Sequence, residues 1–164
     1  MSAAATSGAV YRPSRMRSWA NSIMAWMLRR GVGPPFLRLL TAPGRVSGQP
    51  RTTPVAPVHV DGHVWVVSPY GPVSWVRNVR ATRRLELHRG RESQSYGARE
   101  VDAAEAVPVL RAYLSMPSAR FVRGDFGVTA RSSDEAIRAG APRHPVFALT
   151  PAEAGHRGAS SEGS

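Results

Sequence analysis

The stretch Phe36–Ser68, FLRLLTAPGRVSGQPRTTPVAPVHVDGHVWVVS, decides the fold of this chain. Apolar, β-branched runs alternate in it with short segments rich in Gly and Pro, which is the pattern of strands joined by tight turns. Asp61-Gly62 between two such runs is a strong signal for a hairpin. We expect three strands in this stretch, over residues 36–42, 52–60 and 63–68.

The rest of the chain extends this pattern and adds helices at its borders. Asp102 is a good N-cap with Glu105 at the capping-box position, so a helix begins there. We expect helices over 14–30, 75–82, 102–116 and 134–138, and further strands over 85–89, 93–101 and 144–149. The sum is an α+β protein with about six mostly antiparallel strands, an N-terminal helix and rim helices. This favours a small barrel or a curled sheet over a doubly wound parallel fold.

The first predicted helix, residues 14–30, permits two interpretations. Ser14 can serve as its N-cap, and the Gly and Pro residues from Gly31 onward end it. Apolar residues recur at spacings of three and four, at Met16, Trp19, Ala20, Ile23 and Met27, with Trp26 beside them. This face either packs on the core or lies in a membrane interface, where the flanking Arg side chains meet anionic lipid.

Length and composition limit the alternatives. The 164 residues predict a single domain over 13–150, a flexible N-terminus at 1–12 and a disordered tail at 151–164. The chain has no Cys, which excludes disulfides and thiol nucleophiles and is compatible with a cytoplasmic location. The formal net charge is +11 and every basic residue is Arg. Such a field attracts anionic substrates, polyanions or anionic lipid surfaces.

The segment Pro43–Pro54 carries the strongest pointer to function. Two Arg, one Ser and two Thr lie in a tight loop punctuated by Gly and Pro. Such a loop can present backbone N–H groups, hydroxyls and guanidinium forks to one anion. The candidate anion ligands are Arg45, Ser47, Arg51, Thr52 and Thr53. A solvated hairpin with incidental Arg residues is the alternative.

Other chemistries find less support in the sequence. Ser47 does not occupy the third position of a nucleophile elbow, which argues against a serine hydrolase. The five His show no metal-ligand spacing, so we expect no metal site. No Walker or dinucleotide fingerprint occurs. The aromatic residues do not interleave with the Arg residues as a stacking platform requires, so we expect no nucleic-acid partner.

The order of the motifs resembles a known family, the deazaflavin-dependent nitroreductases of actinobacteria, which are oxidoreductases that use coenzyme F420. Three motifs carry the resemblance: Gly44-Arg45-x-Ser47-Gly48-x-x-Arg51-Thr52-x-Pro54, the Asp61-Gly62 hairpin, and Trp75-x-x-Asn78-x-x-Ala81. It covers roughly residues 36–149. It implies a split β-barrel of the flavin-reductase/PNP-oxidase-like type. It also implies hydride transfer from reduced F420 to a small apolar acceptor such as a quinone, an enone or a nitroaromatic.

The resemblance implies a coenzyme site built on the Gly-rich loop. The loop would hold the phosphate, the following strand would line the deazaflavin ring, and the end of the next strand would meet the ring's polar edge. Trp75 would be mainly structural, and Arg77 could meet the acidic glutamate tail. The implied coenzyme-binding residues are Arg45, Val46, Ser47, Gly48, Arg51, Thr52, Thr53, Pro54, Val55, Ser68, Pro69, Trp75, Arg77 and Asn78.

This chain departs from the family pattern in three places. The segment Ser68–Trp75 is shorter than in the better-known members, so the substrate pocket is expected to differ. Val46 stands where many members carry a basic residue after the first Arg of the loop. No Tyr follows Tyr113, whereas the better-known members place substrate-contacting tyrosines in that part of the chain. Tyr70 is then the candidate proton donor and the one candidate catalytic residue. The acceptor pocket is expected between the first helix and the region around Phe121.

Several alternatives stay open at this point. The same barrel could carry F420, a fatty acid, FMN or haem without turnover, and the missing tyrosines favour such a carrier. Peripheral membrane contact through residues 14–30 is compatible with the sequence. A homodimer is also compatible with it, since split barrels often dimerise.

Overall fold

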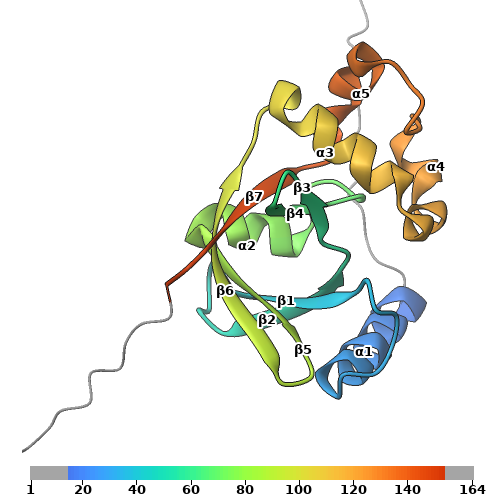
Figure 1. Ribbon diagram of the computed structural model, residues 1–164. Coiled ribbons are helices and arrows are strands. Elements are labelled where there is room, and N and C mark those ends of the chain that lie inside the picture. Colours follow the sequence, from blue (N-terminus) through green and yellow to red (C-terminus); the bar gives the residue numbers. More distant parts are fainter. Residues whose placement is uncertain (1–14, 154–164) are drawn as a thin grey trace, which may run out of the picture.

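The computed structural model describes residues 15–153, with side chains from Asn21 onward. In this part of the chain seven strands form one antiparallel sheet in the order β2-β1-β5-β6-β7-β4-β3, as Figure 1 shows. The strands are β1 (Arg38–Pro43), β2 (Pro50–Val55), β3 (Val58–Val60), β4 (His63–Val67), β5 (Arg84–Arg89), β6 (Glu92–Glu100) and β7 (Val146–Pro151). The predicted flexible segment 1–12 and residues 154–164 of the predicted tail lie outside the described residues. The single domain over 13–150 therefore stays a prediction.

The sheet curls into a split β-barrel because its two edge strands are consecutive in the chain. β2 ends at Val55 and β3 begins at Val58, so only Ala56 and Pro57 connect the opposite edges. The expected split β-barrel is confirmed, but the expected continuous strand over 52–60 is wrong. Pro57 cannot donate to a ladder and also restricts the residue before it, so the chain leaves one edge and enters the other.

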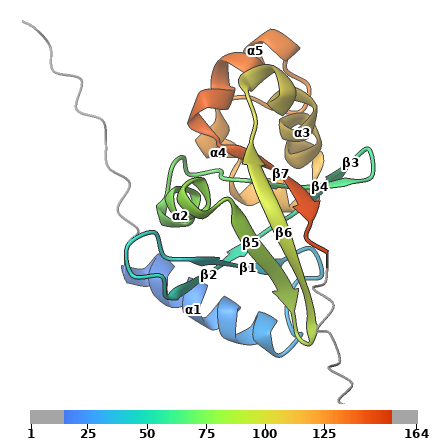
Figure 2. The same ribbon diagram turned by 90° about the vertical axis from the view of Figure 1, so that its left-hand side faces the viewer.

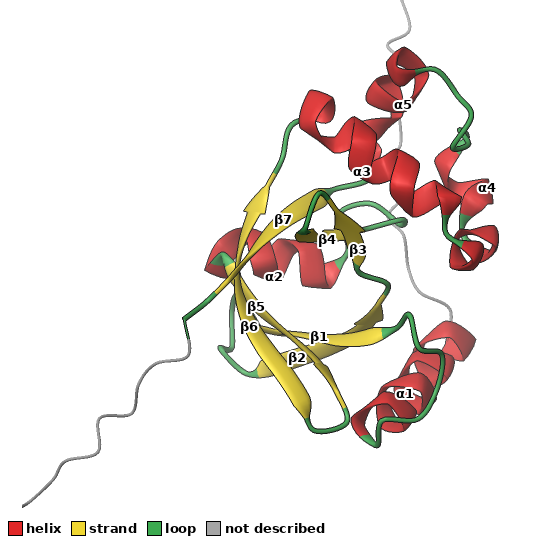
Figure 3. Cartoon of the chain, viewed as in Figure 1, coloured by secondary structure: helices red, strands yellow, loops and turns green. Residues whose placement is uncertain are grey.

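Helices cover the barrel at three places. α1 (Arg15–Arg29) contacts β1 and β2, and α2 (Ser74–Thr82) contacts β1, β2 and β6. α3 (Ala103–Ser115) packs against α5 (Asp134–Gly140), β3 and β4. The remaining helical turns are η1 (Pro117–Phe121), α4 (Arg123–Phe126) and η2 (Ala141–Arg143). Figure 3 shows α3, α4 and α5 gathered on one side of the sheet, away from α1.

The expected helices over 75–82, 102–116 and 134–138 correspond to α2, α3 and α5. Asp102 caps α3 as expected, since its side chain accepts a hydrogen bond from the Glu105 amide at 2.8 Å. The reciprocal half of the capping box does not form. The Glu105 carboxylate pairs with Arg99 at 2.7 Å instead, and this hydrogen bond lowers the pKa of Glu105.

The face that α1 buries differs from the expected one. Leu28 is fully buried, whereas Ile23 and Trp26 are 39% and 54% exposed. Arg89 of β5 explains this orientation, because its guanidinium donates hydrogen bonds to four carbonyl oxygens in the connection 31–37. The connection fixes how α1 meets the sheet, and the helix turns its Leu28 edge inward. Ser14 and the side chains of Met16, Trp19 and Ala20 lie outside the described residues.

Two apolar cores lie on the two faces of the curled sheet. The first fills the barrel interior with inward residues such as Leu40, Val66 and Phe147, and with Val79 from α2. The second lies between the outer face of β3 and β4 and the helices α3 and α5; Ile137 is among its fully buried side chains. The ends of the barrel are therefore the places where the sheet can present polar groups.

Candidate functional site

The β1–β2 connection, residues 44–49, forms a tight loop at one end of the barrel, near α2 (Figure 2). The Gly44 amide donates to the Gln49 carbonyl at 2.8 Å, and the Gly48 amide donates to the Gly44 carbonyl at 2.8 Å. Gly48 has a φ of +69°, a conformation that favours glycine. A Cβ on Gly44 would lie 3.0 Å from Ser47 Oγ and 3.2 Å from the Gln49 oxygen, so a side chain there would force the loop open.

This loop presents donors to solvent. Arg45 and Arg51 are exposed, and neither takes part in an ion pair among the described residues. The Val46 side chain is 91% exposed, and its amide has no hydrogen-bond partner in the described chain. Ser47 Oγ accepts a hydrogen bond from the Gln49 amide at 3.3 Å, which leaves its own proton available. Backbone N–H, hydroxyl and guanidinium groups on one loop suit an anion.

Asn78 connects the loop to α2. Its side chain is buried, with 4% exposure. Its Oδ1 accepts hydrogen bonds from the Arg45 amide at 3.2 Å and from Arg45 Nη1 at 3.1 Å. One buried oxygen therefore holds both the backbone and the side chain of Arg45. The sequence motif indicated Asn78 but not this partner.

The other predicted residues of α2 differ in what they can reach. Trp75 is half-buried, and its ring lies 5.8 Å from that of Phe147, so it anchors α2 to the barrel. Arg77 is exposed and forms no ion pair among the described residues. Arg80 makes two hydrogen bonds of 2.7 Å to Glu100, which raise the pKa of Arg80. Arg77 is therefore the guanidinium of this helix that an anionic ligand can use.

β2 is an edge strand that leads away from the loop. Pro50 and Pro54 have no N–H group to donate. Both therefore occupy the strand positions whose backbone groups point away from β1. Thr52 lies two residues from each of these prolines, so its backbone groups point the same way as theirs. The Thr52 N–H therefore faces the unpaired edge of β2. β2 can thus offer one backbone donor, as well as side chains, to a ligand lying along it.

The two threonines of β2 lie on opposite faces of the sheet. The Thr52 hydroxyl is 3.1 Å from Thr41 Oγ1, so it is engaged within the sheet. Thr53 lies on the other face, together with Val55, which is buried in the barrel core. Of the two threonines that the sequence offered as alternative helpers of the anion ligands, each presents its hydroxyl to a different face of the sheet, and the role of either stays a prediction.

The segment after β4, residues 68–71, is held by hydrogen bonds on both sides. Ser68 is fully buried, and its hydroxyl donates to the Gly71 carbonyl at 2.6 Å. Its amide donates to the Pro145 carbonyl at 2.9 Å, and His144 Nδ1 lies 2.9 Å from the Pro69 carbonyl oxygen. The segment is thereby fixed against the start of β7, and the Ser68 hydroxyl is already occupied.

His144 is buried in a way that favours its neutral form. It is 4% exposed, its ring stacks on Phe126 with centroids 4.0 Å apart, and its Nε2 has no hydrogen-bond partner in the described chain. Burial lowers the pKa of His144, and the charge of Arg143 lowers it further. With Nε2 unprotonated, Nδ1 carries the proton and donates a hydrogen bond to the Pro69 carbonyl.

We expect the protein to lose stability as the pH falls below about 6.5, the ordinary pKa of histidine. The unfolded chain takes up a proton there, while folded His144 resists protonation, so stability is full above this pH and declines toward the lowered pKa. Urea denaturation at about pH 7.5 and about pH 5.5 measures the decline. In His144→Asn, which keeps a donor for the Pro69 carbonyl, the decline should be smaller. An identical decline in both proteins would contradict this account.

Tyr70 belongs to this segment. It is half-buried and packs against the core between β3, β4 and α3. Burial raises the pKa of Tyr113 in that core, and the nearby Tyr70 raises it further, so the two phenols are neighbours. The role of Tyr70 as proton donor stays a prediction.

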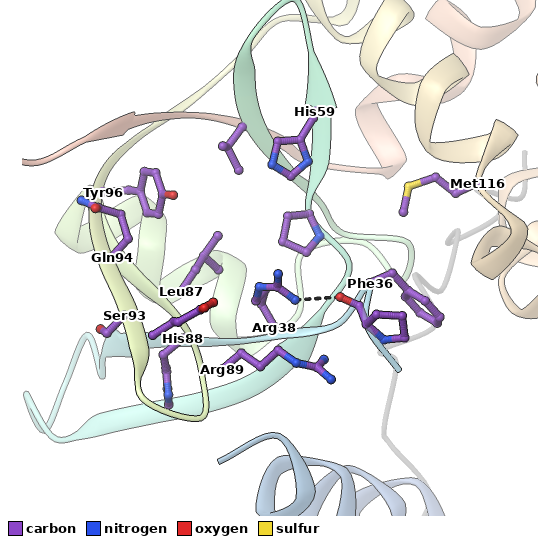
Figure 4. Close-up of a pocket in the computed structure, with 14 residues that line it drawn as sticks. Phe36, Arg38, His59, Leu87, His88, Arg89, Ser93, Gln94, Tyr96 and Met116 are labelled. Carbon is purple, nitrogen blue, oxygen red and sulfur yellow. Dashed lines mark hydrogen bonds between the residues drawn. The ribbon is translucent and has the colours of Figure 1, made fainter. Parts of the chain in front are cut away.

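The sequence did not indicate a cavity of about 450 Å³ at the other end of β1 and β2. Figure 4 draws its lining residues: Pro35, Phe36, Arg38, Pro57, His59, Val64, Leu87, His88, Arg89, Glu92, Ser93, Gln94, Tyr96 and Met116. Phe121, which we expected beside the acceptor, is 71% exposed and does not line this cavity. The sequence did carry one signal for this cavity. Arg38 is a charged residue at a strand position where the alternation would otherwise place an apolar side chain inside the barrel.

Fold and loop together define a class of protein, the split β-barrels of the flavin-reductase/PNP-oxidase-like type. Residues 20–125 match the family model described as F420H(2)-dependent quinone reductase. The chain belongs to this family. It is an F420H2-dependent reductase whose coenzyme is F420, which confirms the oxidoreductase class and the coenzyme that the resemblance implied.

Two solved structures with TM-scores above 0.5 support the fold, and a third is similar at a lower score. One described as a domain-swapped dimer has a TM-score of 0.54 and 21% identity, covering 81% of this chain and 98% of that one. A protein of unknown function from Agrobacterium tumefaciens has a TM-score of 0.52 and 16% identity, covering 87% of this chain and 57% of that one. An F420-H2 dependent reductase (FDR-A) has a TM-score of 0.49 and 23% identity, covering 71% of this chain and 95% of that one.

Proposed function

We propose that this reductase binds F420 along β2, with the coenzyme phosphate on loop 44–49, and that its acceptor is a quinone. The observation that supports the binding mode is the loop itself. It combines an unpartnered amide at Val46, a hydroxyl at Ser47 and two guanidiniums without carboxylate partners, at Arg45 and Arg51. These donors fit the phosphate of F420, and the closed turn at Gly44 leaves no side chain in its way.

The bound coenzyme supplies hydride, and the protein supplies position, charge and exclusion of water. Arg45 and Arg51 hold the phosphate, and Asn78 keeps Arg45 in place. The Thr52 N–H at the open edge of β2 donates to the ring, while Pro54 and Val55 set its distance from the sheet. Segment 68–71 borders the ring, with Pro69 nearer to it than the buried Ser68 hydroxyl. Arg77 attracts the glutamate tail.

A quinone is the acceptor class that the family description favours, and an enone or a nitroaromatic are the competing classes. Reduction of a quinone to a hydroquinone by hydride also consumes one proton. Tyr70, within segment 68–71, or solvent supplies it. The strongly basic chain suits both the acidic coenzyme and an acceptor that gains negative charge as it is reduced.

We also propose that α1 touches anionic membrane surfaces, which would bring the protein to a lipophilic quinone. Ile23 and Trp26 are exposed on α1, and the Arg30 guanidinium lies 4.5 Å from the centre of the Trp26 ring. Exposed apolar side chains beside Arg are the features of an interfacial helix. In residues 15–153 no helix is both long and apolar enough to cross a membrane. Homodimerisation is a further proposal, which light scattering tests directly.

The proposed function is tested by two measurements. Titration of the protein with F420, followed by the coenzyme's fluorescence, should give saturable binding. Reduced F420 should then be oxidised faster with 2-methyl-1,4-naphthoquinone than with a nitroaromatic or an enone of similar size. Faster turnover of either competitor would replace the quinone by that class, and tight F420 binding without turnover of any of the three would contradict the proposed acceptors.

A further inference from the structure

The inward positions of the barrel change character from one end to the other. At the end near loop 44–49 they carry apolar side chains such as Ala42, Leu85 and Phe147. Toward the opposite end the same alternation places polar side chains inward. These are Arg38, His59, Arg89, Glu92 and Gln94, which follow from the pairs Leu40–Leu87, Leu87–Gln94, Arg89–Glu92 and His59–Val64. Tyr96, the partner of Leu85, lies at the border between the two ends. Polar groups at inward positions are costly in a packed core, so this end is built as a cavity and not as core.

The cavity has the size and surface of a small-molecule site. Its volume of about 450 Å³ lies within the range of ligand pockets. Leu87 and Val64 contribute apolar surface from the barrel interior, while Phe36, 39% exposed, and Met116 contribute it at the mouth. In Figure 4 His59 lies above the hollow, Tyr96 and Gln94 on one side, and Phe36 and Met116 on the other.

Two guanidiniums and the carboxylate of Glu92 line the cavity, which leaves it with a net positive charge. Arg38 Nη1 donates to the Pro35 carbonyl at 2.8 Å and the Leu37 carbonyl at 2.9 Å. Arg89 donates to the Pro34 carbonyl at 2.5 Å and the Gly33 carbonyl at 2.7 Å. All these acceptors are neutral, and neither Arg forms an ion pair among the described residues. Both guanidiniums are held in place. Arg38 engages only Nη1, so the rest of its guanidinium can reach an electron-rich oxygen, whereas both Nη groups of Arg89 are bound to carbonyls and Arg89 contributes its charge.

The cavity lies where a coenzyme bound to the loop would end. β2 starts beside loop 44–49 and ends at Val55, two residues before Pro57, which lines the cavity. Six strand residues span about 17 Å at about 3.3 Å per residue. A ligand anchored by its phosphate and lying along β2 therefore reaches toward the cavity with its ring end.

We propose that this cavity binds the acceptor, a planar quinone, with its ring against Leu87 and Val64 and its oxygens toward Arg38 and Arg89. The proposal rests on the proposed function for the identity of the acceptor, and it adds the place where that acceptor binds. His59, Gln94 and Tyr96 complete the wall. A positive wall at this place favours an acceptor oxygen that gains negative charge during reduction.

The test compares two substitutions on neighbouring residues of β6. Gln94 lines the cavity at its exposed rim, where its Nε2 donates to the Ser95 carbonyl at 2.9 Å and the Ala152 carbonyl at 3.3 Å. Ser95 is also exposed, but it lies on the other face of the strand and does not line the cavity. We expect Gln94→Phe to weaken binding of 2-methyl-1,4-naphthoquinone to the coenzyme-free protein by about tenfold or more, because the new ring takes up cavity volume. Calorimetry measures this binding without turnover. In the loaded enzyme the KM for the quinone should rise more than kcat falls. Ser95→Phe should change neither quantity.

The outcomes separate this proposal from the proposed function. Equal quinone binding by Gln94→Phe, Ser95→Phe and the unmodified protein would overturn the cavity as the acceptor site. A loss of F420 affinity in Gln94→Phe alone would overturn it too, because the cavity would then hold the coenzyme. If quinone binding depends on Gln94 but the quinone does not oxidise reduced F420, the cavity remains a quinone site. The quinone is then not the acceptor, which contradicts the proposed function. Thermal unfolding checks that Gln94→Phe folds. If it does not, the test is repeated with His59→Phe, and His63→Phe serves as the control.

Discussion

Arg51→Ala should lower the affinity for F420 by about 10- to 150-fold, which corresponds to about 1.5–3 kcal/mol for a lost hydrogen bond to a charged group. Arg51 is exposed at the start of β2 and forms no ion pair among the described residues. Its substitution therefore removes no internal contact that the fold needs. The loss should appear in binding, and thermal stability should change little. Titration followed by the coenzyme's fluorescence measures the affinity, and thermal unfolding checks the fold.

The long-range field of a strongly basic chain must be separated from direct contact. Arg138→Ala removes the same charge from α5, on the other side of the sheet, and serves as the matched control. Its effect on F420 affinity should be small and should vanish at high salt. Arg51→Lys should recover part of the affinity, because a lysine keeps the charge but not the planar fork. If Arg51→Ala and Arg138→Ala have the same effect, Arg51 does not contact the coenzyme.

The sequence predicted most of the barrel because its strands are short, alternating and joined by tight turns. The hairpin at Asp61-Gly62 and the capped helix after Asp102 are local features, and local features can be recognised without tertiary information. The expected strand over 52–60 is wrong because the apolar pattern continues across Ala56 and Pro57. Only the closure of the barrel shows that these two residues connect opposite edges of one sheet.

The site was predicted less completely than the fold, since its chemistry depends on contacts between distant segments. The Gly-rich loop is visible in the sequence, but the hydrogen bonds from Arg45 to Asn78 join residues 33 positions apart. The sequence could not decide between the two interpretations of the apolar face of α1 for a similar reason. Spacing alone cannot tell that Arg89, from a strand far along the chain, fixes the connection after the helix. The cavity likewise needs the register of several strands, which no single segment encodes.

Asn78 should be the residue whose loss affects both stability and coenzyme binding most clearly. In Asn78→Leu the Arg45 amide and guanidinium lose their shared acceptor, and a buried position loses its polar partner. We expect a loss of about 1–3 kcal/mol in the free energy of unfolding, which is the usual cost when a buried hydrogen-bond partner is removed. The F420 affinity should fall as well, since Arg45 and the loop are no longer held. Urea denaturation and the F420 titration measure the two losses separately.

Asn78→Asp distinguishes the position of Arg45 from its charge. An aspartate keeps an oxygen where Oδ1 accepts from Arg45, so stability should be nearer to that of the unmodified protein than in Asn78→Leu. The added negative charge, however, pairs with Arg45 and offsets its attraction for a phosphate. Asn78→Asp should therefore bind F420 weakly while remaining folded. If it binds F420 as tightly as the unmodified protein, Arg45 contributes no charge to coenzyme binding, and the phosphate must be held by Arg51 and the backbone of the loop.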